Sequence, residues 1–291
     1  MPEPSDGRCD PRSWQTLLFV PADKRDMLCK AQRYGADAVL VDLEDAVAPQ
    51  GKAAARTLLT ALLGDGALDG PSAICVRVNA VGEGVEEDLA AIAGAHVAAI
   101  VLPKVSDAAA VTHARAAINE RLEGGESVGL VPQVESVLGI LELGRLTGVG
   151  GVDALAFGGE DFCVDLGVAR SEDALELLVP RALLALQARA ADLPAIDTVY
   201  TAIHDEQGLL REATTARQLG FTGKLLIHPS QIQPVRRVFA PTDEELVWAR
   251  RVLETQGSAD GSEAGVGVVD GRMVDAPVIG QAERLLARER R

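Results

Sequence analysis

Four acidic side chains follow apolar runs of the sequence and could together hold a divalent cation. Asp42 and Glu44 close one run, Glu135 closes another, and Asp161 ends the stretch Gly158–Asp161 after a third. Carboxylates brought close together cannot all stay ionised without a counter-charge. Because no histidine cluster accompanies them, their oxygen ligands favour Mg²⁺ over Zn²⁺. Mg²⁺ held by one or two carboxylates keeps positions for water and substrate oxygens.

Arg77, in the stretch Val76–Asn79, adds a cation suited to an organic acid. Its planar guanidinium can bind a carboxylate through two parallel hydrogen bonds. A metal ion beside such an arginine predicts a site for a 2-oxo acid such as glyoxylate or oxaloacetate. The metal would polarise the keto carbonyl and the alkoxide that develops from it.

Three other features have plainer interpretations. Lys104 follows an apolar run and could form a Schiff base, but a lysine among carboxylates is more often a charge partner. Gly125–Gly129 matches the G-x-S-x-G pattern of serine hydrolases, yet it leads into a strand, whereas the nucleophile elbow leaves one. His228 is expected to position neighbouring groups, and the other three histidines are scattered.

The candidate site residues must be positioned by strands and helices, and the sequence contains eight β-rich runs that alternate with eight helical patterns. The β-rich runs are Thr16–Val20, Ala38–Asp42, Ala73–Val78, Ala98–Leu102, Val128–Val134, Ala154–Phe157, Ala195–Val199 and Lys224–Ile227. The helical segments are Lys24–Tyr34, Lys52–Leu63, Glu86–Ala93, Asp107–Leu122, Val137–Leu146, Glu172–Ala191, Gly208–Leu219 and Ser230–Val238. This alternation predicts an α/β fold, a (β/α)₈ TIM barrel over residues 13–240. An open doubly wound sheet is the alternative, but its usual glycine-rich first turn is missing from Pro21–Arg25.

Seven of the eight runs are apolar until their end and then turn polar. The polar endings are Asp42–Asp45, Arg77–Asn79, Pro103–Lys104, Gln133–Glu135, Gly158–Asp161, Asp197 and His228–Gln231. Polar loops are common, so one such ending means little. A barrel opens its active site at the carboxyl ends of its strands, so seven endings in register predict a real site there.

Residues 241–291 do not continue the barrel pattern and are predicted to form a C-terminal appendage or lid. Asp243–Gln256 is expected to be a helix, and 257–267 a flexible connection rich in glycine, serine, alanine and acidic residues. Val268–Met273, centred on Asp270-Gly271, predicts a hairpin. A final helix is expected within Ala276–Arg291.

Composition excludes several classes of function. The 291 residues carry a net charge of −15, which disfavours nucleic acid and anionic membranes as partners. Hydrophobic residues make up 47% and aromatic residues 3%, so the core must be built from small aliphatic side chains. The four cysteines form no C-x-x-C pair, Met1–Gln15 lacks an apolar signal segment, and no run of about 18 apolar residues occurs. A cytoplasmic protein with reduced thiols is expected.

Seven ordered motifs resemble the citrate lyase β-subunit-like proteins of the HpcH/HpaI aldolase/citrate lyase superfamily, which include malyl-CoA and β-methylmalyl-CoA lyases. The motifs are Leu18–Asp23, Val41–Val47, Val76–Asn79, Leu102–Lys104, Pro132–Ser136, Gly158–Asp161 and Ile227–Gln231. The resemblance extends from about Trp14 to the C-terminus. It implies a Mg²⁺ cofactor, replaceable by Mn²⁺, and a CoA thioester as substrate.

The resemblance also implies roles for individual residues of the barrel. Glu135 and Asp161 are implied to be the metal ligands, and Arg77 is implied to hold the substrate carboxylate. Asp42 and Glu44 are implied to support the metal-bound waters and the arginine.

Further implied roles concern the substrate and the neighbouring subunit. Glu135 and Asn79 are also expected to contact the substrate, and Lys24, Arg25 and Lys30 could meet the CoA phosphates. The segment Asp270–Asp275 matches a family motif whose last aspartate acts as acid–base in a neighbouring subunit. Asp275 would therefore make a homo-oligomer, a trimer or hexamer, part of the mechanism.

The implied reaction is reversible cleavage of a 3-hydroxyacyl-CoA, such as malyl-CoA or citryl-CoA, into an acyl-CoA and a 2-oxo acid. Four alternatives stay open: a malyl-CoA thioesterase, a citrate lyase β subunit acting on an acyl carrier protein thioester, a metal-dependent pyruvate aldolase, and a catalytically silent binding protein.

Overall fold

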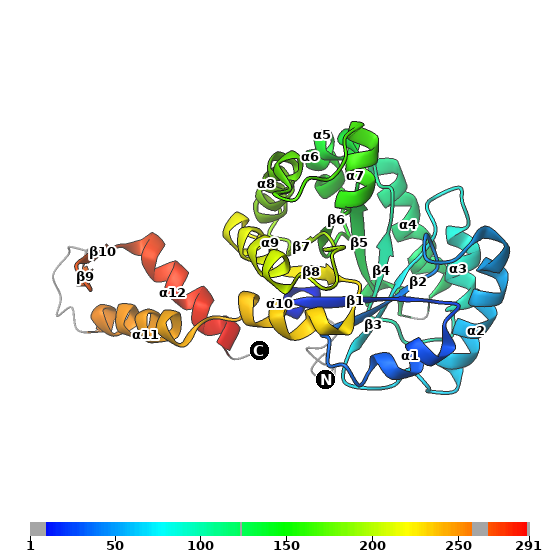
Figure 1. Cartoon of the computed structure of the whole chain (residues 1–291), viewed down its shortest axis with the longest axis horizontal. Helices are drawn as coiled ribbons and strands as arrows, with labels where there is room; N and C mark the ends of the chain where they lie inside the picture. Colours follow the sequence, from blue (N-terminus) through cyan, green and yellow to red (C-terminus); the bar gives the residue numbers. More distant parts are fainter. Residues whose placement is uncertain (1–9, 123, 258–266, 290–291) are drawn as a thin grey trace. The chain divides into compact units, whose positions relative to one another are not determined.

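The computed structural model describes residues 10–122, 124–257 and 267–289, and its centre is a closed barrel of eight parallel strands (Figure 1). The strands are β1 (Thr16–Pro21), β2 (Ala38–Asp42), β3 (Ala73–Arg77), β4 (Ala99–Leu102), β5 (Gly129–Val134), β6 (Leu155–Phe157), β7 (Ala195–Asp197) and β8 (Gly223–Leu226). They pair in sequence order, and β8 closes on β1. The predicted (β/α)₈ barrel is confirmed.

Small aliphatic side chains fill the barrel interior, as the low aromatic content requires. Alternate residues of the strands point inward, among them Leu17, Leu40, Cys75, Val131 and Leu225, all of them buried. Their opposite neighbours face the surrounding helices, which is why parallel strands are apolar on both sides. The inward positions set the phase for the residues that follow at the carboxyl ends of the strands.

Helices follow the strands around the barrel (Figure 1). They are α1 (Arg25–Ala31), α2 (Lys52–Gly64), α3 (Val85–Ala91), α4 (Ala108–Arg121), α5 (Val137–Leu141), α6 (Leu143–Gly148), α7 (Gly159–Leu166), α8 (Leu175–Ala190), α9 (Glu206–Leu219) and α10 (Ile232–Phe239). The single helix predicted for Val137–Leu146 is wrong, because the backbone leaves helical geometry at Glu142 and separates α5 from α6. The sequence analysis also missed α7, which begins at a glycine pair and is too short for a clear periodic pattern.

The chain divides into two compact units, Met1–Arg236 and Arg237–Arg291, where the sequence analysis places the boundary after residue 240. The second unit contains α11 (Asp243–Gly257), a hairpin of β9 (Gly267–Val269) and β10 (Arg272–Val274), and α12 (Ala276–Glu289). Asp270 and Gly271 connect the two strands with positive φ angles of 51° and 75°, as a type I′ turn requires. The predicted hairpin is confirmed.

Some expectations concern residues outside the described ranges, namely most of Met1–Gln15 with Cys9, and residues 258–266 of the expected flexible connection. The other three cysteines, Cys29, Cys75 and Cys163, form no disulfide within the described part of the chain. None of the helices in the described part of the chain combines the length and apolar character that crossing a bilayer demands.

Its place at the end of β7 suggested that Asp197 faces the mouth of the barrel, but it does not. Its inward neighbour Ile196 belongs to the barrel core, so Asp197 points outward to α8 and α9. There it accepts two hydrogen bonds from Arg181, at 2.8 and 2.9 Å, and one from Lys224 Nζ at 2.7 Å. Lys224 also donates to Glu212, again at 2.7 Å. Asp197 is therefore part of a buried ionic network behind β7 and β8.

Replacing Lys224 by methionine is expected to destabilise the protein by about 3 to 5 kcal/mol, because two carboxylates lose a buried partner. Lys224 is fully buried, and its ammonium contacts Asp197, Glu212 and the carbonyl of Thr198. Urea unfolding at pH 7 measures the effect. Lys30→Met, on the exposed side of α1, is the control, and an equal small loss in both variants would contradict the expectation.

Acid is expected to weaken the same network. Burial by itself raises the pKa of Asp197, but Lys224 and Arg181 outweigh burial and hold the pKa below its usual value. A carboxylate with a lowered native pKa stabilises the fold above its unfolded pKa of about 4, and this contribution disappears as the pH falls through the native pKa. The unfolding free energy, followed by urea titration, should decline below about pH 4, and less steeply in Asp197→Asn.

Candidate active site

A cavity of about 430 Å³ lies at the carboxyl ends of the strands. Its wall includes Asp42 from β2, Arg77 from β3 and Gln133 from β5, with Asp161 from the start of α7. These positions continue the inward alternation of their strands, so their polar side chains form the top of the barrel interior. This is the place where barrels carry their chemistry.

Arg77 and Asp42 form a buried ion pair across neighbouring strands, at paired positions of β3 and β2. Arg77 donates from Nε to Asp42 Oδ1 at 2.8 Å and from Nη2 to Oδ2 at 2.6 Å. The guanidinium also stacks over the Phe19 ring, 4.7 Å from its centre. Burial by itself lowers the pKa of Arg77, but Asp42 and Glu44 outweigh it and raise the pKa, so the cation persists.

This pairing decides how Arg77 can bind a ligand. The edge formed by Nε and Nη2 is taken by Asp42, whereas Nη1 lies 3.3 Å from Glu44 Oε2. A substrate carboxylate would therefore approach the end of the guanidinium, at Nη1 and Nη2. Asp42 holds the arginine in place for such a contact.

Glu44 and Lys104 form a second ion pair at the same end of the barrel, with Nζ 2.6 Å from Oε1. Glu44 is almost fully buried, and burial raises its pKa above the usual value. The Glu44 carboxylate in turn raises the pKa of Lys104, which keeps the ammonium protonated. Lys104 is thus placed as a charge partner of Glu44, the role that the sequence favoured.

Glu135 and Asp161 bring two carboxylates close together, and Asp161 lines the cavity. Glu135 is 3% exposed, and it accepts hydrogen bonds from the backbone nitrogen of Lys104 at 2.6 Å and from the Gln133 side chain. Burial and the neighbouring Asp161 raise the pKa of Glu135 to about 8. Burial and Asp45 raise the pKa of Asp161 above its usual value.

The Glu135–Asp161 pair suits Mg²⁺ better than it suits a metal that takes all its ligands from the protein. Within residues 10–122, 124–257 and 267–289, no three histidine, cysteine or acidic side chains cluster in a metal-binding arrangement. Mg²⁺ is commonly held by one or two carboxylates and fills its other positions with water and substrate oxygens. A cation between the two acids would also offset the repulsion from Asp161 that contributes to the raised pKa of Glu135.

Because Gly158 has no side chain, Glu135 can pack against it, and this contact yields a test of the Glu135–Asp161 pair. A Cβ atom at position 158 would lie 2.6 Å from Glu135 Cβ and 2.9 Å from Gln133 Nε2. Gly158→Ala should therefore displace Glu135 and weaken Mg²⁺ binding about tenfold or more, measured by calorimetry. In the control Gly150→Ala, the added Cβ meets no atom within 4 Å. Unchanged Mg²⁺ affinity in Gly158→Ala would show that Glu135 is not a ligand.

The other barrel residues predicted to bind substrate lie away from the cavity wall. Asn79 is fully buried, donates to Leu43 and Asp88, and accepts from Lys52, so it holds loops together in this conformation. Lys24 and Arg25 are exposed at the start of α1, where Lys24 pairs with Asp23 at 3.0 Å. Their contact with CoA stays a prediction.

Asp275 belongs to the second unit and has a local structural partner. Its Oδ1 accepts a hydrogen bond of 3.2 Å from the backbone nitrogen of Val278, in the first turn of α12. The aspartate thus caps that helix. The cap uses Oδ1, and the acid–base role in a neighbouring subunit stays a prediction.

Two site residues escaped the sequence analysis as functional groups. Gln133 donates to Glu135, and Thr198 Oγ1 accepts from the Gly159 backbone at 2.8 Å, which holds the start of α7. Gln133 could have been found, since it is two residues before Glu135 and shares its inward direction. Thr198 had no such signal, because its partner lies on a helix that was not predicted.

The chain forms a closed TIM barrel with paired carboxylates and a buried arginine at its mouth. These groups suit an enzyme that acts on an anionic substrate with the help of a metal ion. Residues 15–229 match the family model described as HpcH/HpaI aldolase/citrate lyase. The chain belongs to this family and is a lyase.

Similar proteins cover nearly the whole chain. Citrate lyase subunit beta of Leuconostoc mesenteroides subsp. cremoris is 36% identical over 94% of this chain and 92% of its own length. The human mitochondrial citramalyl-CoA lyase is 33% identical over 92% of this chain and 83% of its own. The structure of CitE from Mycobacterium tuberculosis with magnesium, acetoacetate and coenzyme A is 34% identical, with a TM-score of 0.80, and covers 96% of this chain and 100% of that one.

Proposed function

We propose that this lyase cleaves a 3-hydroxyacyl-CoA, such as malyl-CoA or citryl-CoA, into an acyl-CoA and a 2-oxo acid with the help of Mg²⁺. The observation that carries the proposal is one cavity lined by the Arg77–Asp42 pair and by Asp161 of the Glu135–Asp161 pair. The first pair suits the carboxylate of an oxo acid, and the second suits the metal. The magnesium and coenzyme A named for the similar CitE structure support the same reading.

The residues of the chain divide the work. Glu135 and Asp161 would hold Mg²⁺, which supplies a positive charge for the oxygen that gains negative charge during cleavage. Arg77 would bind the oxo-acid carboxylate at its Nη1–Nη2 end, while Asp42 and Glu44 fix the guanidinium. Buried and already paired, these groups need little reorganisation when substrate arrives.

A proton must also reach the acyl-CoA. Breaking the carbon–carbon bond leaves an enolate on the thioester side, and Asp275 of another subunit would protonate its α-carbon, or remove that proton in the condensing direction. Lys24 and Arg25 would meet the CoA phosphates. Both assignments rest on the resemblance and on their place in the chain.

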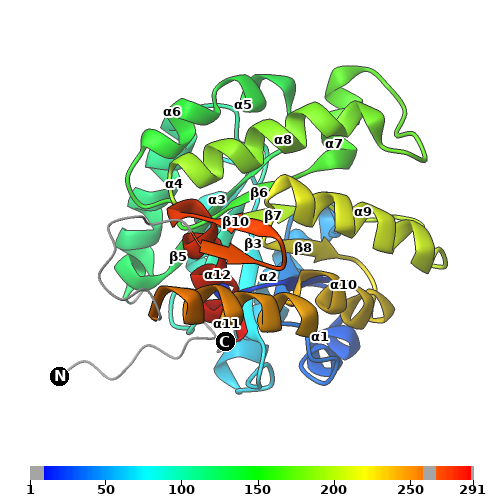
Figure 2. The ribbon, with the colours of Figure 1, turned by 90° about the vertical axis from the view of Figure 1, so that its left-hand side faces the viewer.

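Oligomerisation has a separate observation in its favour. Large apolar side chains are exposed on α5, α7 and α8, which contact one another on one side of the barrel (Figure 1, Figure 2). They include Leu141 at 73%, Val164 at 78% and Leu175 at 71% exposure. Exposed apolar patches of this kind mark protein interfaces. A homo-oligomer, a trimer or hexamer, is part of the proposal.

A second candidate is favoured by the relatives named citrate lyase subunit beta. In this version the thioester is carried by an acyl carrier protein, and the chain works within a complex. Copurification with a carrier protein would favour it, whereas turnover of free CoA esters by the isolated chain would count against it.

The deciding experiment is a substrate screen with Mg²⁺. Purified protein is tested with acetyl-CoA and propionyl-CoA, each paired with glyoxylate, pyruvate or oxaloacetate, and with malyl-CoA and citryl-CoA. Free thiol and oxo acid are followed separately. We expect acyl-CoA and oxo acid in equal amounts without free thiol. Free thiol would indicate a thioesterase, and turnover of pyruvate with a free aldehyde would indicate an aldolase.

A further inference from the structure

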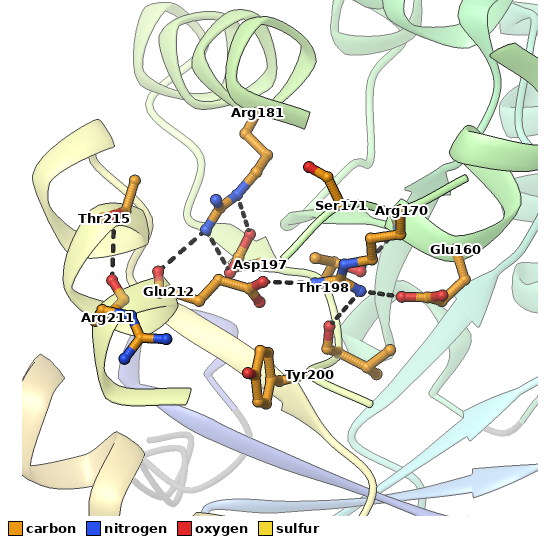
Figure 3. A network of polar contacts seen from close by, with 12 residues as sticks. Glu160, Arg170, Ser171, Arg181, Asp197, Thr198, Tyr200, Arg211, Glu212 and Thr215 are labelled. Atoms are coloured by element: carbon orange, nitrogen blue, oxygen red, sulfur yellow. Dashed lines mark hydrogen bonds and ion pairs between the residues drawn. The ribbon is translucent and has the colours of Figure 1, made fainter. Parts of the chain in front are cut away.

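A chain of ion pairs, buried except at Glu160, leads from strand β8 to the first turn of α7, and Figure 3 shows its part from Glu212 through Arg170 to Glu160. It begins at Lys224 on β8, whose ammonium donates to Glu212 Oε1 at 2.7 Å. The other oxygen of Glu212 accepts a hydrogen bond of 2.6 Å from Arg170 Nη2. Arg170 Nη1 donates to Glu160 Oε1 and, at 3.0 Å, to the carbonyl oxygen of Val199.

The near end of this chain lies beside the metal-binding pair. Glu160 is the residue before Asp161, and both belong to the first turn of α7. Glu160, Asp161 and Val199 all line the active-site cavity. A contact that fixes Glu160 against Val199 therefore also fixes the backbone that carries Asp161.

The helix needs such support because it is short. α7 has eight residues, and an isolated helix of this length is unstable in water. Its N-cap residue, Gly158, offers no side-chain cap, so the first turn depends on tertiary contacts. Two contacts supply them, the hydrogen bond from Gly159 to Thr198 and the bridge made by Arg170.

Arg170 is well suited to transmit a fixed position. Its side chain is 12% exposed and that of Glu212 is 8%, while those of Lys224 and Asp197 are fully buried. Its planar guanidinium donates from two separate nitrogens, Nη2 to Glu212 and Nη1 to Glu160 and Val199, and so holds these partners at fixed angles. The network as a whole is anchored in β7 and β8 rather than in a surface loop.

We propose that Arg170 is a positioning residue for Asp161, which it holds at the metal site by clamping Glu160 to Glu212 and to the carbonyl of Val199. The inference rests on the proposed function, since it takes Asp161 as a ligand of Mg²⁺. Arg170 touches neither the metal nor the substrate in this account. It acts on the metal affinity through the placement of the first turn of α7.

The test measures metal binding directly, with Mn²⁺ as a paramagnetic probe that Mg²⁺ displaces. The binding step that disappears in Glu135→Gln defines the site. Arg170→Met keeps the length of the side chain and removes its donors, and we expect its Mn²⁺ dissociation constant to rise about tenfold. Arg170→Lys should lie between, because Arg170 reaches its partners from two separate nitrogens and a lysine offers one. Arg189→Met is the control, since Arg189 is 71% exposed and pairs only with Asp192.

A double variant tests the route. Glu160→Gln, at a partly exposed site, should also raise the dissociation constant, and Arg170→Met combined with it should add little. Fully additive effects would overturn the route through Glu160. If Arg170→Met does not fold, Glu160→Gln alone decides, and an unchanged Mn²⁺ affinity in it overturns the proposal.

The remaining outcomes separate this inference from the proposed function. If Arg170→Met binds Mn²⁺ as tightly as the unaltered protein and only loses stability in urea, the positioning role is wrong and the metal site stands. If the unaltered protein has no binding step that depends on Glu135, the proposed function falls and this inference falls with it.

Discussion

Glu135→Gln and Asp161→Asn are each expected to reduce Mg²⁺-dependent cleavage by about three orders of magnitude or more, because Lewis-acid stabilisation contributes several kcal/mol. Each substitution removes one of only two carboxylates that the pair offers to the metal. Initial rates over a range of Mg²⁺ concentrations measure the loss. Both substitutions keep the size of the side chain. Burial raises the pKa of Glu135, which means that the ionised carboxylate is unfavourable there, and glutamine carries no charge. We therefore expect both proteins to remain folded.

The matched control is Asp165→Asn, on the same helix as Asp161 and one turn later. Asp165 accepts a hydrogen bond of 2.7 Å from the backbone of Val137, and asparagine can accept it too. Near-normal activity is expected in this variant. Full activity in Glu135→Gln or in Asp161→Asn, with the control unchanged, would exclude the proposed metal site.

Asp275→Asn is expected to lower kcat by roughly two to four orders of magnitude without loss of stability. The amide oxygen of asparagine can still accept from Val278 and cap α12, but the side chain can no longer exchange a proton. Asp275→Ala removes both the cap and the acid, and should cost about 1 kcal/mol of stability in addition. Activity and urea unfolding are measured on the same preparations. If Asp275→Asn retains activity and Asp275→Ala only loses stability, the residue is a helix cap and nothing more.

Mixing subunits tests where Asp275 acts. Arg77→Ala and Asp275→Ala are expected to be inactive for different reasons, so a mixed oligomer should contain some sites with both an intact arginine and an intact aspartate. We expect partial recovery of activity after subunit exchange, with exchange followed by a labelled subunit. Exchange without any recovery would mean that Asp275 serves its own chain or has no catalytic role.

The barrel could be predicted from the sequence because its strands are buried on both faces and carry short apolar runs that end in polar residues. Asp42, Arg77 and Glu135 stand at three such ends, and closure of a parallel barrel brings those ends to one mouth whatever the loops do. The hairpin turn at Asp270-Gly271 was equally local, since only a few residue types tolerate two positive φ angles in succession.

Tertiary structure alone decided what these side chains do once they meet. Asp197 ends a strand as Asp42 does, yet the phase of β7 turns it outward to Arg181 and Lys224, whereas the phase of β2 turns Asp42 inward to Arg77. The occupied edge of Arg77 and the Glu135–Asp161 pair depend on the same phases. The contact between Arg170, which follows α7 in the chain, and Glu212 on α9 was likewise decided by the tertiary structure.

The types and order of the chemical residues were therefore determined by the sequence itself, together with the number of strands that carry them. Their directions and partners were determined by the closed barrel, because a side chain's direction depends on strand phase and its partners are distant in the chain. A pattern of residue types gives neither the direction of a side chain nor its partners.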